Sequence, residues 1–317
     1  TSRAQAPMNP MRSLLLAGSR NAWLQRQATH RRFVKLAVRR FMPGETLDEA
    51  LVAAGEQNRL GIAVTLTHLG ENLRDKAEAD GVLAHYLGAL DRIRGGNLNA
   101  EVSIKPTQLG LDIDAALCEA HTRTLAEAAR VHGSRLWIDM EGTAYTEPTL
   151  ALYRKLRETH ANVGLCLQSY LLRTRADLES LLPLGPAIRI VKGAYAEPAA
   201  LVFSDKREVD ENFHWMAERL WSAEARAKGA WATLGTHDTL LIGRLEGTAL
   251  KLGVGPKDYE YAMLYGIQRG EQQRLAKSGR NVHVLISYGA HWFPWYMQRL
   301  AERPANLLFV AKSMFSG

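Results

Sequence analysis

The chain has 317 residues, a formal net charge of +7 and 46% hydrophobic residues. This composition is typical of a globular protein with ample core material, and no apolar run reaches the roughly 18 residues of a membrane span. The length suits one large barrel or two small domains. Because the only two cysteines, Cys118 and Cys166, form no CxxC pair, we expect neither a disulfide framework nor a zinc site. This cysteine usage predicts a reducing compartment, the cytoplasm.

The positive charge is concentrated at the N-terminus. No acidic residue precedes Glu45, and nine basic residues do, so the +7 of the chain less this +9 leaves about −2 for the rest. An arginine-rich, acid-free N-terminus is typical of a transit peptide, of a surface for an anionic partner or of a solvated amphipathic helix, and we favour the last. Any membrane contact would then be peripheral. Because the tryptophans are scattered and do not alternate with basic runs, we expect no nucleic-acid partner.

Residues 1–60 are predicted to form a basic helical arm ahead of a barrel domain at residues 61–317. Thr46 is a candidate N-cap for a helix over 47–54. Glu49 falls at the N3 position, which completes a capping box, and Gly55 is the expected stop.

Beyond the arm, short runs rich in Val, Ile and Leu alternate with longer stretches of helical periodicity such as 116–129. Strands that alternate with helices imply parallel βαβ units, and eight such units in about 250 residues predict an α/β fold, a (β/α)8 TIM-type barrel. A doubly wound open sheet is the alternative, but no G-x-G-x-x-G follows the first strand. The predicted strands are 62–67, 101–105, 135–140, 162–167, 187–191, 231–236, 258–263 and 282–287.

Polar residues gather where the predicted strands end, which is the end of a barrel that carries the active site. Seven of the eight strands end in or lead into such groups, a pattern that indicates a site. The residues alone leave the chemistry open, since Lys192 is a candidate Schiff-base nucleophile and His237 a candidate general base. No cluster of His or carboxylate residues has the spacing of metal ligands, so no metal site is predicted.

Six strings, in the same order along the chain, resemble the proline dehydrogenase family, in particular its bacterial monofunctional type. They are HLGE at 68–71, SIKPTQLGLD at 103–112, LQSYLLRT at 167–174, IRIVKGAY at 188–195, THD at 236–238 and RLAERPANLLF at 299–309. The resemblance runs from about Arg31 to Ser313. It implies a distorted (β/α)8 barrel that binds FAD noncovalently and dehydrogenates a proline-like amine or amino acid by hydride transfer to flavin N5.

The resemblance also implies roles for individual residues. Arg189 and Asp139 match catalytic positions, with Arg189 near flavin N5, where a cation stabilises the electron-rich reduced flavin. Lys105 matches the lysine that pairs with the substrate carboxylate, and we expect a Lys105–Asp139 ion pair without substrate. The positions that match cofactor-binding residues are Met140, Gln168, Lys192, Gly193, Ala194, Thr236, His237 and Glu302.

The substrate end departs from the family pattern. Gln298-Arg299 stands where two arginines normally clamp the substrate carboxylate, and Trp295 and Leu285 replace two residues that are commonly Tyr. One lost charge-assisted contact is worth roughly 1.5 to 3 kcal/mol, or about 10- to 100-fold in affinity. We therefore predict a substrate that is a carboxylate-bearing amine of unsettled identity.

Two alternatives follow from these departures. One is a divergent relative that acts on a different amine intermediate in a biosynthetic pathway. The other is a catalytically silent barrel that binds flavin or another ligand, against which stands the retention of Lys105, Asp139, Arg189 and Arg299 together. The electron acceptor is expected to be a quinone or oxygen.

Overall fold

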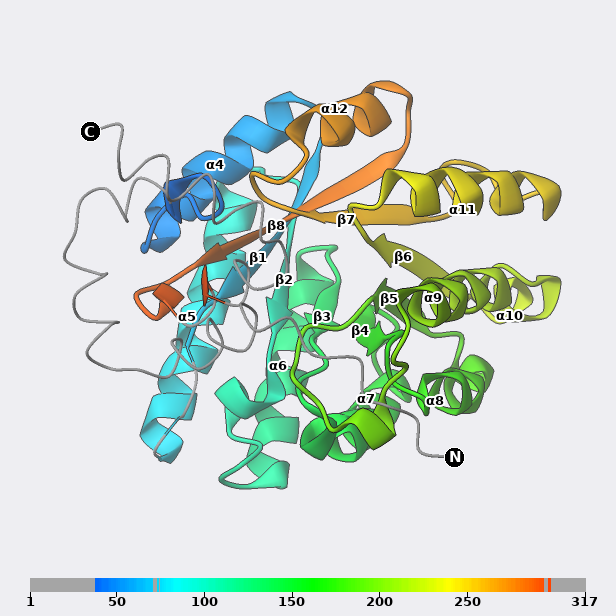
Figure 1. Ribbon diagram of the computed structural model, residues 1–317. Coiled ribbons are helices and arrows are strands. Elements are labelled where there is room, and N and C mark those ends of the chain that lie inside the picture. Colours follow the sequence, from blue (N-terminus) through cyan, green and yellow to red (C-terminus); the bar gives the residue numbers. More distant parts are fainter. Residues whose placement is uncertain (1–37, 71–72, 74, 294–295, 298–317) are drawn as a thin grey trace.

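The computed structural model describes residues 38–70, 73, 75–293 and 296–297. Eight parallel strands close into a barrel in chain order, and the helices surround it (Figure 1). The strands are β1 (Ala63–His68), β2 (Ala100–Ile104), β3 (Leu136–Ile138), β4 (Val163–Gln168), β5 (Ala187–Val191), β6 (Trp231–Gly235), β7 (Glu260–Leu264) and β8 (Asn281–Tyr288). The helices are α4 (Leu47–Arg59), α5 (Lys76–Gly95), α6 (Ala115–Val131), α7 (Thr146–Arg157), α8 (Thr174–Leu181), α9 (Lys206–Leu220), α10 (Ala223–Ala227), α11 (Thr239–Lys251) and α12 (Arg269–Lys277).

The closed barrel confirms the predicted fold and excludes the open sheet. Each of the eight predicted strands is present, with ends shifted by two residues at most, and α6 contains the predicted helix at 116–129. Strand β4 is buried along its whole length, because one face lines the barrel and the other lies under the helices.

Helix α4 belongs to the barrel wall. It contacts both β1 and β8, so it covers the seam between the first and last strands (Figure 1). The helix places Ala50, Ala53 and Ala54 in the main core, each at most 3% exposed. Small side chains on this face let the helix lie close to the strands, and the described end of the predicted arm is therefore packed against the barrel.

The two ends of α4 test the capping prediction separately. The capping box of Thr46 and Glu49 is present, as predicted. The predicted stop at Gly55 is wrong, because the helix continues to Arg59. Its last turn is anchored by Asn58, whose side chain donates to the carbonyl oxygens of residues 62 and 99. The turn away from the helix is made instead at Gly61, whose φ of 74° suits glycine.

A second apolar cluster joins the segment before α4 to the segment after β8. It includes Leu69, which follows β1, so it flanks the C-terminal end of the barrel. The indole nitrogen of Trp292 donates to Glu45 at 3.1 Å and ties the two segments together. The members are Val38, Phe41, Met42, Leu69, Trp292, Phe293 and Tyr296.

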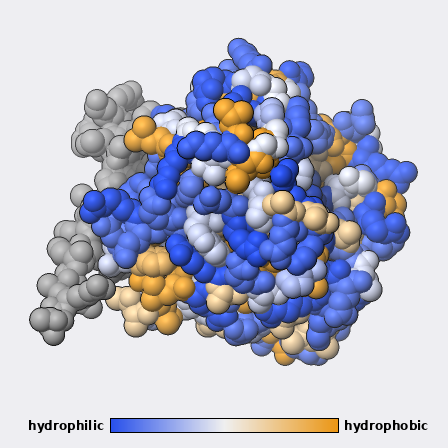
Figure 2. Space-filling view, turned by 90° about the vertical axis from the view of Figure 1, so that its right-hand side faces the viewer, coloured by the Kyte–Doolittle hydropathy of each residue, from blue (hydrophilic) through white to orange (hydrophobic). Residues whose placement is uncertain are grey.

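The surface carries its apolar residues in small groups. Figure 2 views the side of the barrel that carries α9, α10 and α11, and this face is mainly hydrophilic with separate apolar spots. Leu240 and Leu250 of α11 are 86% and 81% exposed. None of the helices in the described ranges combines the length and the hydropathy of a membrane-spanning segment.

The capping box gives a direct test of how α4 contributes to stability. Replacing Thr46 with Ala removes the acceptor for the Glu49 N–H and should lower the free energy of unfolding by about 1 kcal/mol. Urea denaturation followed by circular dichroism measures this change. Thr46→Ser keeps the hydroxyl and should retain most of the stability, and an equal loss in both variants would contradict the role of the cap.

Candidate active site

The C-terminal ends of the strands surround a cavity of about 810 Å³. Its volume lies in the upper part of the range found for sites of small molecules and cofactors. Every strand, or the residue that follows it, contributes to the lining, so the cavity lies at the strand ends, where the sequence predicts the site. Representative lining residues in strand order are Thr65, Lys105, Asp139, Gln168, Arg189, Gly235, Ala262 and Leu285.

All predicted site residues within the described ranges line this one cavity, although they come from six strands or their ends. The sequence therefore predicted correctly which end of the strands faces the cavity. Four further predictions, Trp295, Gln298, Arg299 and Glu302, lie outside the described residues. The eleven that the structure brings together are Lys105, Asp139, Met140, Gln168, Arg189, Lys192, Gly193, Ala194, Thr236, His237 and Leu285.

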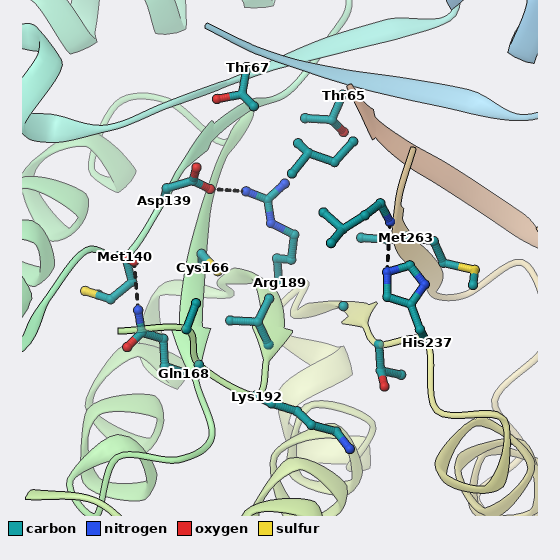
Figure 3. Close-up of a pocket in the computed structure, with 18 of the residues that line it drawn as sticks. Thr65, Thr67, Asp139, Met140, Cys166, Gln168, Arg189, Lys192, His237 and Met263 are labelled. Atoms are coloured by element: carbon teal, nitrogen blue, oxygen red, sulfur yellow. Dashed lines mark hydrogen bonds and ion pairs between the residues drawn. The ribbon is translucent and has the colours of Figure 1, made fainter. Parts of the chain in front are cut away.

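Asp139 lies at the centre of a charged cluster. Its carboxylate accepts from Lys105 Nζ at 3.3 Å. It also pairs with Arg189, as Figure 3 shows. The Lys105–Asp139 ion pair is therefore confirmed. Ser103 was not predicted, yet its hydroxyl donates to Asp139 at 2.9 Å and accepts from Arg189 at 2.7 Å. The signal for it was its place two residues before Lys105, on the same inward face of β2.

The charges in this cluster stabilise one another. Burial favours the neutral acid, but Lys105 and Arg189 outweigh it and hold the pKa of Asp139 below its usual value. Burial likewise opposes the charge of Arg189, and the Asp139 carboxylate raises the pKa of that guanidinium. Two cations against one carboxylate leave a net charge of +1, which suits the carboxylate of a small substrate.

Gln168 presents a hydrogen-bond acceptor that no described residue uses. Its side chain is buried, and its amide nitrogen donates to the carbonyl oxygens of Met140 at 2.8 Å and Glu141 at 3.2 Å. Because these bonds fix the amide, Oε1 is fixed as well, and it has no partner among the described residues. A buried acceptor of this kind requires a donor, which an N–H of a ligand in the cavity would supply.

The stretch after β5 takes a backbone shape that requires glycine. Gly193 has a φ of 119°, and a Cβ at this position would overlap the ring of Tyr170. The preceding Lys192 lies between Asp210 and Asp238, with Nζ–oxygen distances of 2.5 and 3.1 Å. This charged setting differs from the apolar pocket of a Schiff-base lysine, so the structure gives no support to that chemistry.

Asp238 performs two tasks at the N-terminus of α11. One carboxylate oxygen caps the helix by accepting from the Leu241 N–H at 3.3 Å, and the other binds Lys192 and, at 3.2 Å, Lys206. Although burial acts in the opposite direction, these contacts lower the pKa of Asp238. Next to it, His237 accepts from the backbone N–H of Leu264 at 3.1 Å, which ties the ends of β6 and β7 together.

A group of aromatic side chains at the other side of the barrel, near β1 and β8, was not predicted. The rings of His68 and His85 lie 4.3 Å apart, and His85 Nε2 is 2.8 Å from the hydroxyl of Tyr288. Burial, together with His85 and His291, lowers the pKa of His68 to about 4.

The described residues contain no group of three or more His, Cys, Asp or Glu side chains arranged for a metal ion.

Comparison with known proteins places this chain in a family. The family model described as Proline dehydrogenase matches residues 50–312. Proline dehydrogenase 1 of Bacillus subtilis (strain 168) is 35% identical over 281 residues, which cover 88% of this chain and 91% of that protein. The chain belongs to the proline dehydrogenase family. The proline dehydrogenase of Deinococcus radiodurans is 34% identical over 283 residues, with 88% and 90% covered. As a family member the protein is an FAD-dependent oxidoreductase, which confirms the predicted enzyme class and cofactor.

Solved structures agree with the fold. Proline utilization A (PutA) from Bdellovibrio bacteriovorus, inactivated by N-propargylglycine, superposes with a TM-score of 0.78 at 19% sequence identity. The match covers 92% of this chain and 36% of that chain, so this chain spans about a third of the longer protein. At such low identity the likeness concerns the barrel fold alone.

The lowered pKa of His68 predicts acid sensitivity. Between pH 6.5, the ordinary pKa of histidine, and about 4, His68 is protonated in the unfolded chain but not in the folded chain. The free energy of unfolding therefore falls as the pH falls through this window. The slope is at most about 1.4 kcal/mol per pH unit, before allowance for partial exposure. His68→Gln removes this titration, and thermal unfolding measured across the window should show a flatter pH profile than the wild type. Parallel profiles would contradict the assignment to His68.

Proposed function

We propose that this enzyme oxidises L-proline, or a closely similar cyclic secondary amine that carries a carboxylate, to the cyclic imine. The observation that supports this best is the cluster of Lys105, Asp139 and the buried Arg189 at one cavity. In this cluster Lys105 is the cation that would pair with the substrate carboxylate, and Arg189 is the guanidinium that would lie beside the flavin. The curated relatives of near-full-length similarity are named proline dehydrogenases.

FAD, when bound, supplies an acceptor for the hydride that leaves the carbon next to the ring nitrogen. The chain's own residues bind and orient the substrate. Lys105 pairs with its carboxylate, and Asp139 holds Lys105 and Arg189 in place. Arg189 brings its positive charge to the part of the cavity where electron density increases during the reaction. Leu285 supplies an apolar wall.

The same cavity contains a chemically suitable set of groups for FAD. Gln168 offers its Oε1, which has no partner in the part of the chain that the structure describes, to a flavin N–H, and Met140 lies beside it. Lys192 and the backbone at Gly193 and Ala194 suit the dianionic diphosphate. Thr236 and His237 are proposed for the adenosine side, whereas Glu302 lies outside the described residues.

The alternatives for the substrate are separated by a panel of amines. A different amine intermediate remains the second candidate, because Leu285 lines the cavity where the family pattern has Tyr. A catalytically silent barrel is disfavoured by the intact arrangement of Lys105, Asp139 and Arg189. For the electron acceptor we propose a quinone or oxygen. The cytoplasm stays the predicted compartment, in agreement with two buried free cysteines.

The proposed activity is tested by anaerobic mixing of the purified yellow protein with L-proline. The visible absorption of the oxidised flavin should bleach, and the imine product should be trapped by an amine reagent. The matched variant Lys105→Met loses the partner of the substrate carboxylate and should raise the substrate Kd about 10- to 100-fold. If another amine of the panel bleaches the flavin and proline does not, that amine and not proline is the substrate.

The diphosphate assignment is tested with shortened cofactors. Lys192→Met should weaken FAD binding about 10- to 100-fold, because one charge-assisted contact is lost, and should leave riboflavin binding nearly unchanged. Fluorescence titration of the flavin-free protein measures both affinities. Lys251→Met, at the exposed C-terminal turn of α11, is the control. An equal loss for FAD and riboflavin would contradict the contact.

A further inference from the structure

Below the cavity, the barrel interior holds an aromatic ring against Arg189. Trp137 of β3 is 1% exposed. The guanidinium carbon of Arg189 lies 4.8 Å from the centroid of its ring. The edge of the same guanidinium hydrogen-bonds to Ser103 and pairs with Asp139. Arg189 is thus held in two directions, along its edge by polar partners and on its face by an aromatic ring.

Two features fix the indole in this position. Its Nε1–H donates to the carboxylate of Glu101 on the neighbouring strand at 2.7 Å. On the other neighbouring strand, Gly164 pairs directly with Trp137, and a Cβ there would lie 2.6 Å from two atoms of the ring. The backbone of Gly164 is not in the left-handed region, so the requirement for glycine comes from the ring and not from strand geometry.

Glu101 is in turn held by a charged layer deeper in the barrel. The imidazole of His283 lies between two carboxylates, with Nδ1 3.8 Å from Glu101 and Nε2 3.4 Å from Glu260. Glu260 also accepts from the hydroxyl of Thr233 at 2.7 Å and lies 3.7 Å from Arg135. Interiors of such barrels are usually filled with branched apolar side chains. Charged groups at this depth therefore serve a purpose other than filling the core, and one of them, Glu101, holds the indole of Trp137.

We propose that Trp137 is a positioning residue that sets the place and orientation of Arg189 at the cavity, with Glu101 and Gly164 fixing the ring. The proposal rests on the proposed function in one respect, the location of Arg189 beside the flavin. An arginine side chain has several rotatable bonds, and its charge is useful to a redox centre only when it is held in one place. The stacked ring limits its motion without neutralising its charge.

The test measures the midpoint potential of bound FAD, titrated with a chemical reductant in the absence of substrate. Trp137→Leu removes the ring face and should shift the potential to more negative values, because a less ordered Arg189 stabilises the reduced flavin less. The shift should have the same sign as that of Arg189→Lys and be smaller. With a substrate that reduces the flavin, the rate of reduction should fall roughly tenfold.

Trp137→Phe provides a variant that keeps an aromatic core and loses the bond to Glu101, and it should show a smaller shift of the same sign. Trp231→Leu is the matched control. Trp231 also faces the barrel interior, and its ring centroid lies 5.7 Å from the guanidinium carbon of Arg135, which lies 5.3 Å from the ring of Trp137 as well. The control therefore disturbs Arg135 and leaves the ring under Arg189 in place. This control should lower thermal stability and leave the potential unchanged.

The proposal is overturned if both Trp137 variants bind FAD fully and keep the wild-type potential, or if Trp231→Leu shifts it equally. Because the reductant is chemical, these outcomes do not depend on proline being the substrate. A wild-type enzyme that fails to oxidise proline would refute the proposed function alone. Arg189→Lys with an unchanged potential would show instead that Arg189 does not act on the flavin.

Discussion

The site depends on one half-buried carboxylate, that of Asp139. Asp139 lies between Lys105 and Arg189, and without its carboxylate the two cations would face each other unpaired. Removing one member of a fully buried ion pair costs about 3 to 5 kcal/mol, and the cost is smaller here because Lys105 and Asp139 are partly exposed. The carboxylate therefore determines where both cations lie before any substrate arrives, and an incoming carboxylate meets a site whose charges are already in place.

On the cofactor side of the cavity, the side chains and backbone that would hold the ligand also form the local structure of the fold. Asp238 caps α11 and receives Lys192 with the same side chain, so the helix terminus and the cation are fixed together. Gly193 lets the chain pass over Tyr170 where a side chain would collide. In both places one residue serves the fold and the ligand: Asp238 ends the helix and holds Lys192, and Gly193 allows the turn and brings the backbone to the cavity. For this reason the short string VKGAY is a specific signal of the site.

The fold was predictable because its signals are local. Apolar runs define the strands, and the capping box at Thr46 marks the start of α4. Gly55 misled because the anchor that extends this helix, Asn58, bonds to residue 99, far along the chain. The same limit applies to the site. Strand ends identified the cavity, but the contacts of Ser103, Trp137 and the histidines near β1 join strands and helices distant in sequence, and only the closed barrel brings them together.

The position of α4 affects how the barrel is assembled. This helix precedes every strand, yet it packs on the seam between β1 and β8, and the chain from Arg59 to Asn281 separates it from the last of its partners. Contacts of such high sequence separation slow folding, since a long loop must close before they form. During synthesis the part of α4 that contacts β8 therefore stays uncovered until that strand has been made. Apolar surface that is exposed in this way during folding is prone to aggregation.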